Sequence, residues 1–317
     1  MHESHGHAHG LEKHGARPLP SARDRTFAVA TLLNVAIVGM ELVYGYLANS
    51  MALVADAAHN ASDIVALLLA WGAFRLGTRR PTIRRTYGFG SASMLAALAN
   101  AALLLVALGA IAIEAVRRLW QAPPVASETV VWVAAAAIVI NGLTALMFWR
   151  GRESDLNIRG AFLHMATDAG VSLGVVVAAL LIGWTGWAWL DPVVSLLIVA
   201  VIFGGTWALL KESADLAMHA VPANVDRQAV ERYLASLSGV TAVHDLHIWA
   251  LSTTENALTA HLVRPGAGLD DRLLTEAAHK LRAHHGIGHT TLQVEAGDAP
   301  CDCTLKGEQG TESREEG

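Results

Sequence analysis

The stretch ADAAHNASD at residues 55–63 places an ionisable pair inside a long apolar run, and RGAFLHMATD at residues 159–168 does the same. In each stretch a histidine precedes an aspartate by four positions: His59 with Asp63, and His164 with Asp168. Four residues are about one helical turn, so both side chains of a pair share a helix face. A central aspartate in hydrocarbon costs at least ~2.5 kcal/mol, so such residues mark a partner, a cavity or a pathway.

Two imidazoles and two carboxylates that meet between neighbouring helices are suited to a tetrahedral divalent ion, above all Zn²⁺. The sequence therefore predicts a four-ligand metal site within the membrane. The alternative is that each polar residue makes an isolated helix–helix hydrogen bond. The repetition of two ligand types at ligand spacing favours the metal site.

The composition predicts a membrane protein, because 53% of the 317 residues are hydrophobic and only 16% are charged. Six apolar runs each approach the ~20 residues that a spanning helix needs. We therefore predict an α-helical integral membrane domain with six transmembrane helices, embedded in a lipid bilayer. The runs cover residues 27–47, 51–75, 91–116, 128–149, 160–183 and 189–210.

Lysines and arginines gather before the first run, in the second connection and around the end of the fourth run. The connections at residues 48–50 and 184–190 carry none, although Arg117 and Arg118 run against this trend. Short basic loops lie on the cytoplasmic side of a membrane. Both termini are therefore predicted to be cytoplasmic.

The chain divides into four predicted parts. Residues 1–26 form a His-rich disordered tail, 27–210 the transport domain, 211–297 a cytoplasmic α+β domain for regulation and dimerisation, and 298–317 a second disordered tail. Cys301 and Cys303 are too close for an unstrained mutual disulfide, and whether they bind metal as thiolates stays open.

The soluble segment alternates charged and apolar residues in the order α-β-β-α-β, with Asn224 as the expected N-cap of its first helix. About 85 residues bury a modest core, so pairing with a second copy would add stability. The predicted elements are a helix at 225–237, strands at 240–251 and 256–263, a helix at 269–284 and a strand at 290–295.

Histidines are frequent in this soluble segment. His244 and His261 are predicted on the two neighbouring strands, and Glu295 on the last strand would be a third ligand of a cytoplasmic metal site. The alternative is a set of exposed histidines without metal.

Metal and protons compete for the imidazole lone pairs, because a histidine must be neutral to bind a metal and its reference pKa of about 6.5 is near cellular pH. His59 and His164 are therefore predicted to couple metal movement to protons. An inward proton gradient would drive metal outward without ATP, and no Walker-type motif is present.

Three more polar residues lie in the apolar runs, and the sequence allows two roles for each of them. Asp56 lies three positions before His59 and either orients that imidazole or is solvated near the external surface. Glu41 and Asn100 either pack between helices or line a hydrated vestibule. None of the three is predicted to be a ligand.

Two other function classes fit the sequence less well. A membrane metalloenzyme needs a general base beside its metal, and no His-Glu-x-x-His helix is present. A membrane metal sensor would share the sites, but no signalling module follows them. Neither an organic cofactor nor a nucleic-acid partner is indicated.

The two His-x-x-x-Asp stretches, together with YG at 87–88, LDP at 190–192 and VHDLHIW at 243–249, resemble the cation diffusion facilitator family over about residues 25–300. The bacterial cobalt-zinc-cadmium resistance and zinc efflux branch is the most similar. The resemblance implies a homodimer in a bacterial inner membrane that exports zinc in exchange for protons. It also implies a metallochaperone-like cytoplasmic domain, with zinc as its regulatory ligand.

The family's transport site corresponds to His59, Asp63, His164 and Asp168, and its cytoplasmic ligands correspond to His244, His261 and Glu295. A histidine at the first of these positions is associated in the family with a preference for zinc over cadmium. A broader exporter of Co²⁺, Cd²⁺, Ni²⁺ and Zn²⁺ remains an alternative. The family histidine two positions before the last carboxylate is Gln293 here, which departs from a full binuclear cytoplasmic site.

Overall fold

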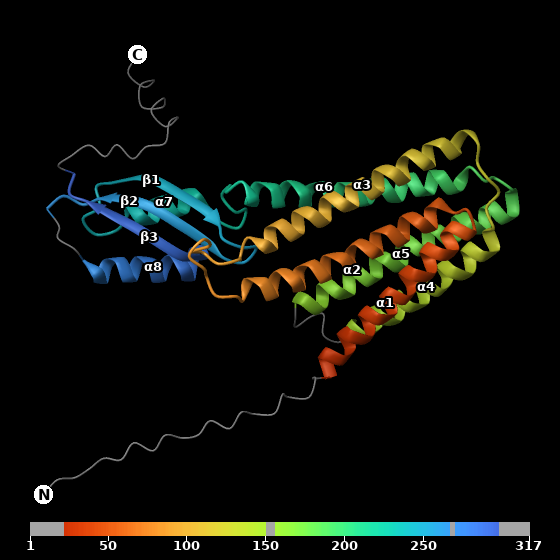
Figure 1. Cartoon of the computed structure of the whole chain (residues 1–317), viewed down its shortest axis with the longest axis horizontal. Coiled ribbons are helices and arrows are strands. Elements are labelled where there is room, and N and C mark those ends of the chain that lie inside the picture. Colours follow the sequence, from red (N-terminus) through yellow and green to blue (C-terminus); the bar gives the residue numbers. More distant parts are fainter. Residues whose placement is uncertain (1–21, 150–155, 267–269, 298–317) are drawn as a thin grey trace, which may run out of the picture. The chain divides into compact units, whose positions relative to one another are not determined.

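The computed structural model describes residues 22–149, 156–266 and 270–297 (Figure 1). The predicted tails lie largely outside these ranges, and Cys301 and Cys303 lie entirely outside them. The chain packs as two units. The first comprises the described residues up to Asn60 together with Pro123–Asp191, and the second comprises Ala61–Ala122 and the described residues from Pro192 onward.

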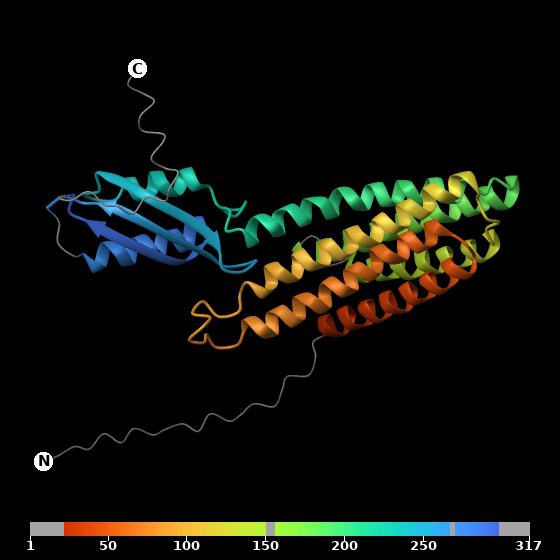
Figure 2. The ribbon, with the colours of Figure 1, turned by 45° about the horizontal axis from the view of Figure 1, so that its top comes forward.

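Six long helices occupy the six predicted apolar runs. Within the described residues, five of them are long and apolar enough to span a membrane, and the apolar part of the remaining helix, Thr31–Leu47, is shorter. In the first unit, α4 packs along α5 and against α1 (Figures 1 and 2). The predicted helical membrane domain is thereby confirmed. The helices are α1 (Ala22–Leu47), α2 (Met51–Gly77), α3 (Ala92–Trp120), α4 (Ser127–Phe148), α5 (Leu156–Thr185) and α6 (Leu190–Ala217).

Several helices extend beyond the predicted runs: α1 begins at Ala22, α3 continues to Trp120, α5 begins at Leu156 and α6 continues to Ala217. The polar segment KESAD at residues 211–215 carries no Pro or Gly, so the α-helix of α6 continues past the end of its apolar run. Hydropathy therefore marks the part of a helix that suits a bilayer and does not mark where the helix ends.

Asp191, at the start of α6, binds the N-terminus of α2. Its Oδ2 accepts a hydrogen bond from the Met51 backbone N–H at 2.6 Å, and its Oδ1 accepts one from the Ser50 hydroxyl. The Ser50 hydroxyl oxygen in turn accepts from the Leu53 N–H at 3.2 Å. A carboxylate at this end of a helix satisfies free N–H groups and complements the helix dipole. The buried Asp191 therefore fixes the beginning of the helix that carries His59.

The soluble domain has the predicted order α-β-β-α-β. Its sheet has the strand order β1-β2-β3, in which β1 and β2 are antiparallel and β2 and β3 are parallel. The predicted N-cap Asn224 is wrong: Asp226 directly precedes the helix and accepts the Ala229 N–H at 3.0 Å, the geometry that caps an N-terminus. The elements are α7 (Arg227–Ala235), β1 (Ala242–Ala250), β2 (Asn256–Val263), α8 (Asp271–His285) and β3 (Ile287–Glu295).

The core of the soluble domain lies between the two helices and one face of the sheet. Apolar side chains of α7 and α8 pack there against alternate residues of β1 and β2. The opposite face of the sheet is therefore free to carry polar residues. The buried core includes Val230, Leu234, Leu246, Ile248, Leu258, Ala260, Leu262, Leu281 and Ile287.

We expect Asp191→Asn to lower the free energy of unfolding by about 1–3 kcal/mol, because it removes a charge-assisted cap from α2. Thermal unfolding of the purified protein in detergent micelles measures this change. Glu114→Gln is the control, since it removes a carboxylate that is only paired on the surface of α3 with Arg117 and Arg118. Equal midpoints for the two variants would contradict the structural role of Asp191.

Candidate metal centres

Asp168 lies between two imidazoles inside the first unit. Its Oδ1 is 3.8 Å from His59 Nε2 on α2, and its Oδ2 is 3.6 Å from His164 Nε2 on its own helix. The two imidazole centroids are 6.2 Å apart. The Asp168 side chain is only 1% exposed, whereas those of His59 and His164 are 24% and 36% exposed. The spacing of four residues brings His164 next to Asp168 on α5, and the packing of α2 adds His59.

These separations suit a metal ion. Zinc binds imidazole nitrogen and carboxylate oxygen at about 2.0–2.2 Å, so neighbouring donors of a tetrahedral ion are about 3.3–3.6 Å apart. The two nitrogen–oxygen separations at Asp168 are at or slightly above this range. The two contacts use different oxygens of Asp168, and the imidazole centroids are 6.2 Å apart, so the two histidines must move closer together for three donors to hold one ion.

Asp63 lies one turn beyond His59 on α2, in the part of that helix that belongs to the second unit. Its spacing from His59 places both side chains on the same helix face. Its membership in the site stays a prediction.

Two further carboxylates are fully buried near these ligands in the first unit. The Ser172 hydroxyl donates to Asp56 Oδ2 at 2.8 Å, and Asn60 Nδ2 donates to Glu41 Oε2 at 3.5 Å. Because Asp56 is 0% exposed, the interpretation of it as a solvated residue near the surface is wrong. The amide of Asn100 donates to Ser62 at 3.3 Å within the second unit, which agrees with a packing role.

The second cluster, formed by His244, His261 and Glu295, lies in the soluble domain. His244 Nε2 is 3.0 Å from Glu295 Oε2, and His261 Nδ1 is 2.8 Å from Glu295 Oε1. One candidate donor atom from each residue lies within 4.8 Å of the other two. The predicted cytoplasmic set therefore comes together on one face of the sheet.

A β-bulge places His244 in this cluster. The pairing shifts between His244 and His247, and the intervening Asp245 has a φ of 52°. Strand side chains alternate between faces, so without the extra residue His244 would share the core face of Leu246. The bulge moves His244 to the outer face, directly opposite His261 in the β1–β2 register.

Neighbouring polar groups hold the Glu295 carboxylate in position. Gln293 Nε2 donates to Glu295 Oε1 at 3.1 Å, so the glutamine orients this carboxylate. Partial burial acts to raise the pKa of Glu295, but the hydrogen bond from His244 and the charges of His244 and His261 outweigh it and lower the pKa. The ionised carboxylate that a metal requires is thereby favoured.

Asp245 and His247 extend the polar cluster along β1. Asp245 Oδ2 is 3.5 Å from His261 Nε2, and its Oδ1 is 3.0 Å from His247 Nε2. Sequence reasoning did not assign a role to Asp245, because its position depends on the bulge.

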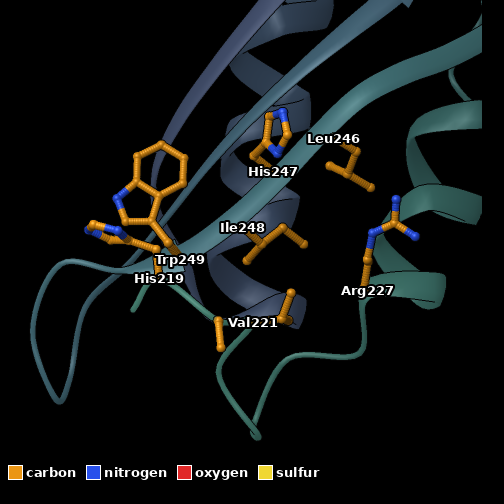
Figure 3. Close-up of a pocket in the computed structure, with 8 residues that line it drawn as sticks. His219, Val221, Arg227, Leu246, His247, Ile248 and Trp249 are labelled. Atoms are coloured by element: carbon orange, nitrogen blue, oxygen red, sulfur yellow. The ribbon is translucent and has the colours of Figure 1, made fainter. Parts of the chain in front are cut away.

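A pocket of about 660 Å³ lies beside β1, where the chain that follows α6 approaches this edge strand (Figure 3). His247 and Trp249 line it from β1, Arg227 from the start of α7, and His219 from the chain that follows α6. His244, His261 and Glu295 do not line this pocket. It is therefore separate from the predicted metal cluster.

Comparisons with known proteins identify the family. A family model described as the cation efflux transmembrane domain matches residues 27–216, and a model of the cytoplasmic domain of cation efflux proteins matches residues 222–297. The chain belongs to the cation efflux family. The cation diffusion facilitator family inferred from the two His-x-x-x-Asp motifs is thus confirmed, and this cation efflux protein is a membrane transporter and not an enzyme.

Three curated relatives cover most of this cation efflux protein. The metal cation efflux system protein CzcD of Cupriavidus metallidurans is 36% identical over 284 residues, with 89% of each chain covered. The zinc transporter ZitB of Escherichia coli is 35% identical over 271 residues, 84% of this chain and 86% of the relative. A cadmium, cobalt and zinc/H⁺-K⁺ antiporter of Bacillus subtilis is 32% identical over 283 residues, 86% of this chain and 89% of the relative.

We expect His244→Ala to weaken Zn²⁺ binding at the cytoplasmic cluster at least about tenfold, because one of three converging ligands is lost. Calorimetric titration of the full-length cation efflux protein in detergent measures this affinity. His279→Ala is the matched control, since His279 is exposed on α8. Equal loss of affinity in both variants would contradict the assignment.

Proposed function

We propose that this cation efflux protein exports Zn²⁺ from the cytoplasm in exchange for protons, through His59, Asp63, His164 and Asp168. The observation that carries the proposal is the buried Asp168 carboxylate with an imidazole nitrogen within 3.8 Å of each oxygen. An ionised carboxylate in such a place needs positive charge, and either a divalent ion or protons on the imidazoles supply it. The same three side chains therefore suit both metal and proton binding.

Zinc is the favoured cargo because the four donors are imidazole nitrogens and carboxylate oxygens in the number that tetrahedral Zn²⁺ requires. The relative named as a zinc transporter supports this choice, and the relative named for metal cation efflux agrees with outward movement of a metal cation. The relative named for cadmium, cobalt and zinc supports a broader cation range as the alternative. Nitrogen and oxygen donors accept several of these ions.

Protons compete with zinc at the histidines. Zinc binding requires neutral His59 and His164, so metal entry from the cytoplasm releases protons to that side. Protonation from the opposite side makes each imidazole a cation, which repels Zn²⁺ and still neutralises Asp168. The proton gradient thereby drives zinc outward.

Orientation and assembly complete the proposal. Both termini and the soluble domain face the cytoplasm of a bacterium, and the protein resides in the inner membrane, as the basic connections predict. The helices expose many large apolar side chains, including Leu103, Val106 and Val201, which suit contact with lipid. The protein acts as a homodimer, in which zinc at His244, His261 and Glu295 tightens the pairing of the cytoplasmic domains and raises transport.

Proteoliposomes that contain a zinc-sensitive and a pH-sensitive dye test the transport site. We expect Asp168→Asn and His59→Ala each to lower the rate of zinc uptake into the proteoliposomes at least about tenfold, because each substitution removes a ligand. His279→Ala should transport normally. Zinc movement with normal pH dependence in both site variants would overturn the assignment.

The regulatory role has its own test. We expect the double variant His244→Ala/His261→Ala to require a higher cytoplasmic-side zinc concentration for half-maximal transport, with the maximal rate retained. Initial rates measured over a series of zinc concentrations give both quantities. An unchanged concentration dependence would remove the regulatory role and leave the transport proposal intact.

A further inference from the structure

A pair of buried carboxylates lies beside the transport ligands and is not part of them. Glu41 comes from α1 and Asp56 from α2, and both are 0% exposed. Asn60, one turn after Asp56 on α2, donates to Glu41 at 3.5 Å. The two carboxylates are close enough to interact electrostatically, and Asp168 on α5 acts on both.

Each carboxylate has one oxygen without a partner. Glu41 Oε1 and Asp56 Oδ1 are buried and accept no hydrogen bond from the described residues. The adjacent Asn60 is also 0% exposed, and its Oδ1 lacks a donor. A proton on either carboxyl group would give these atoms an O–H donor.

The side chains that donate hydrogen bonds to the pair within the described residues are uncharged. The recorded hydrogen-bond donors to it are the Asn60 amide and the Ser172 hydroxyl, and neither residue is ionisable. Asp168 on α5 is the charged group outside the pair that acts on both carboxylates, and the imidazoles of His59 and His164 lie against Asp168. Among described residues, no salt bridge pairs Glu41 or Asp56 with a lysine or arginine.

Two adjacent buried negative charges without a cation are costly, so the pair retains a proton when no metal is near. We propose that Glu41 and Asp56 form a second proton-binding site, which shares one proton and is coupled electrostatically to zinc at the transport ligands. The inference rests on the proposed zinc/proton exchange and extends it to residues that do not touch the metal.

The coupling follows from charge. When Zn²⁺ binds on the cytoplasmic side, its two positive charges stabilise the ionised pair, and one proton leaves a carboxyl group of the pair for cytoplasmic water. When zinc leaves on the other side, the pair takes up one proton from that side. Linkage is reciprocal, so a protonated pair weakens zinc binding by the same factor by which zinc weakens proton binding.

The test measures protons and zinc together in proteoliposomes of the full-length protein. We expect Glu41→Gln and Asp56→Asn each to reduce the protons moved per zinc by about one, because each substitution leaves a single carboxylate, which carries the same charge as the singly protonated pair without binding a proton. Glu114→Gln, which removes a carboxylate paired with arginines on α3, is the matched control and should exchange protons as the wild type does.

An infrared measurement on the wild-type protein keeps the inference testable if a variant fails to fold. With glutamate carboxyl groups labelled with ¹³C, zinc-free protein should show the carbonyl band of a protonated carboxyl group that disappears on zinc addition. Selective labelling of aspartate reports Asp56 in the same way, and a proton shared by the pair appears in either sample.

The outcomes separate the two proposals. The inference is overturned if both variants move the wild-type number of protons per zinc, or if no zinc-sensitive carboxyl band appears with either label. Wild-type uptake of zinc without proton movement would overturn the proposed exchange instead, and the infrared band would then decide the proton site independently.

Discussion

The need to neutralise carboxylates among apolar helices explains the arrangement of the polar residues in the membrane domain. Asp191 lies against the N-terminus of α2, and Glu114 is paired with two arginines. Asp168 lies between two imidazoles. Within the described residues, the hydrogen bonds to Glu41 and Asp56 come from neutral donors. The partners of Asp191 and Glu114 keep their charge or dipole at all times, whereas the imidazoles beside Asp168 and the carboxylate pair gain or lose protons or a metal.

The soluble domain uses similar ligands in a different setting. There the two histidines and the carboxylate come from three strands, and the β-bulge at Asp245 sets which face His244 occupies. A sheet holds its side chains at fixed spacing, so the fold itself holds the three candidate ligands together. His244 and His261 both contact Glu295, and Gln293 donates a hydrogen bond to the same carboxylate.

Local periodicity predicted most of the fold and much of the sites. The spacing of His164 and Asp168 is a property of one helix. Alternation of apolar and polar residues predicted two neighbouring strands, one with His244 and the other with His261. Features that depend on distant residues were not predictable in this way. These include the binding of Asp191 to the start of α2, 140 residues away, and the approach of Glu41 to Asp56. The bulge was missed because no single residue of VHDLHIW requires it.

The first unit also shows which ligand contacts a transport movement can change. His164 and Asp168 are four residues apart on α5, so their contact persists as long as that helix stays intact. The contact between His59 and Asp168 joins two helices, and it changes whenever α2 moves against α5. At the proposed transport site, separation of α2 from α5 would therefore break the contact of His59 while keeping that of His164. Because Asp56 lies on α2 as well, the same movement would alter its hydrogen bond from Ser172 on α5, which connects the carboxylate pair to the proposed metal ligands.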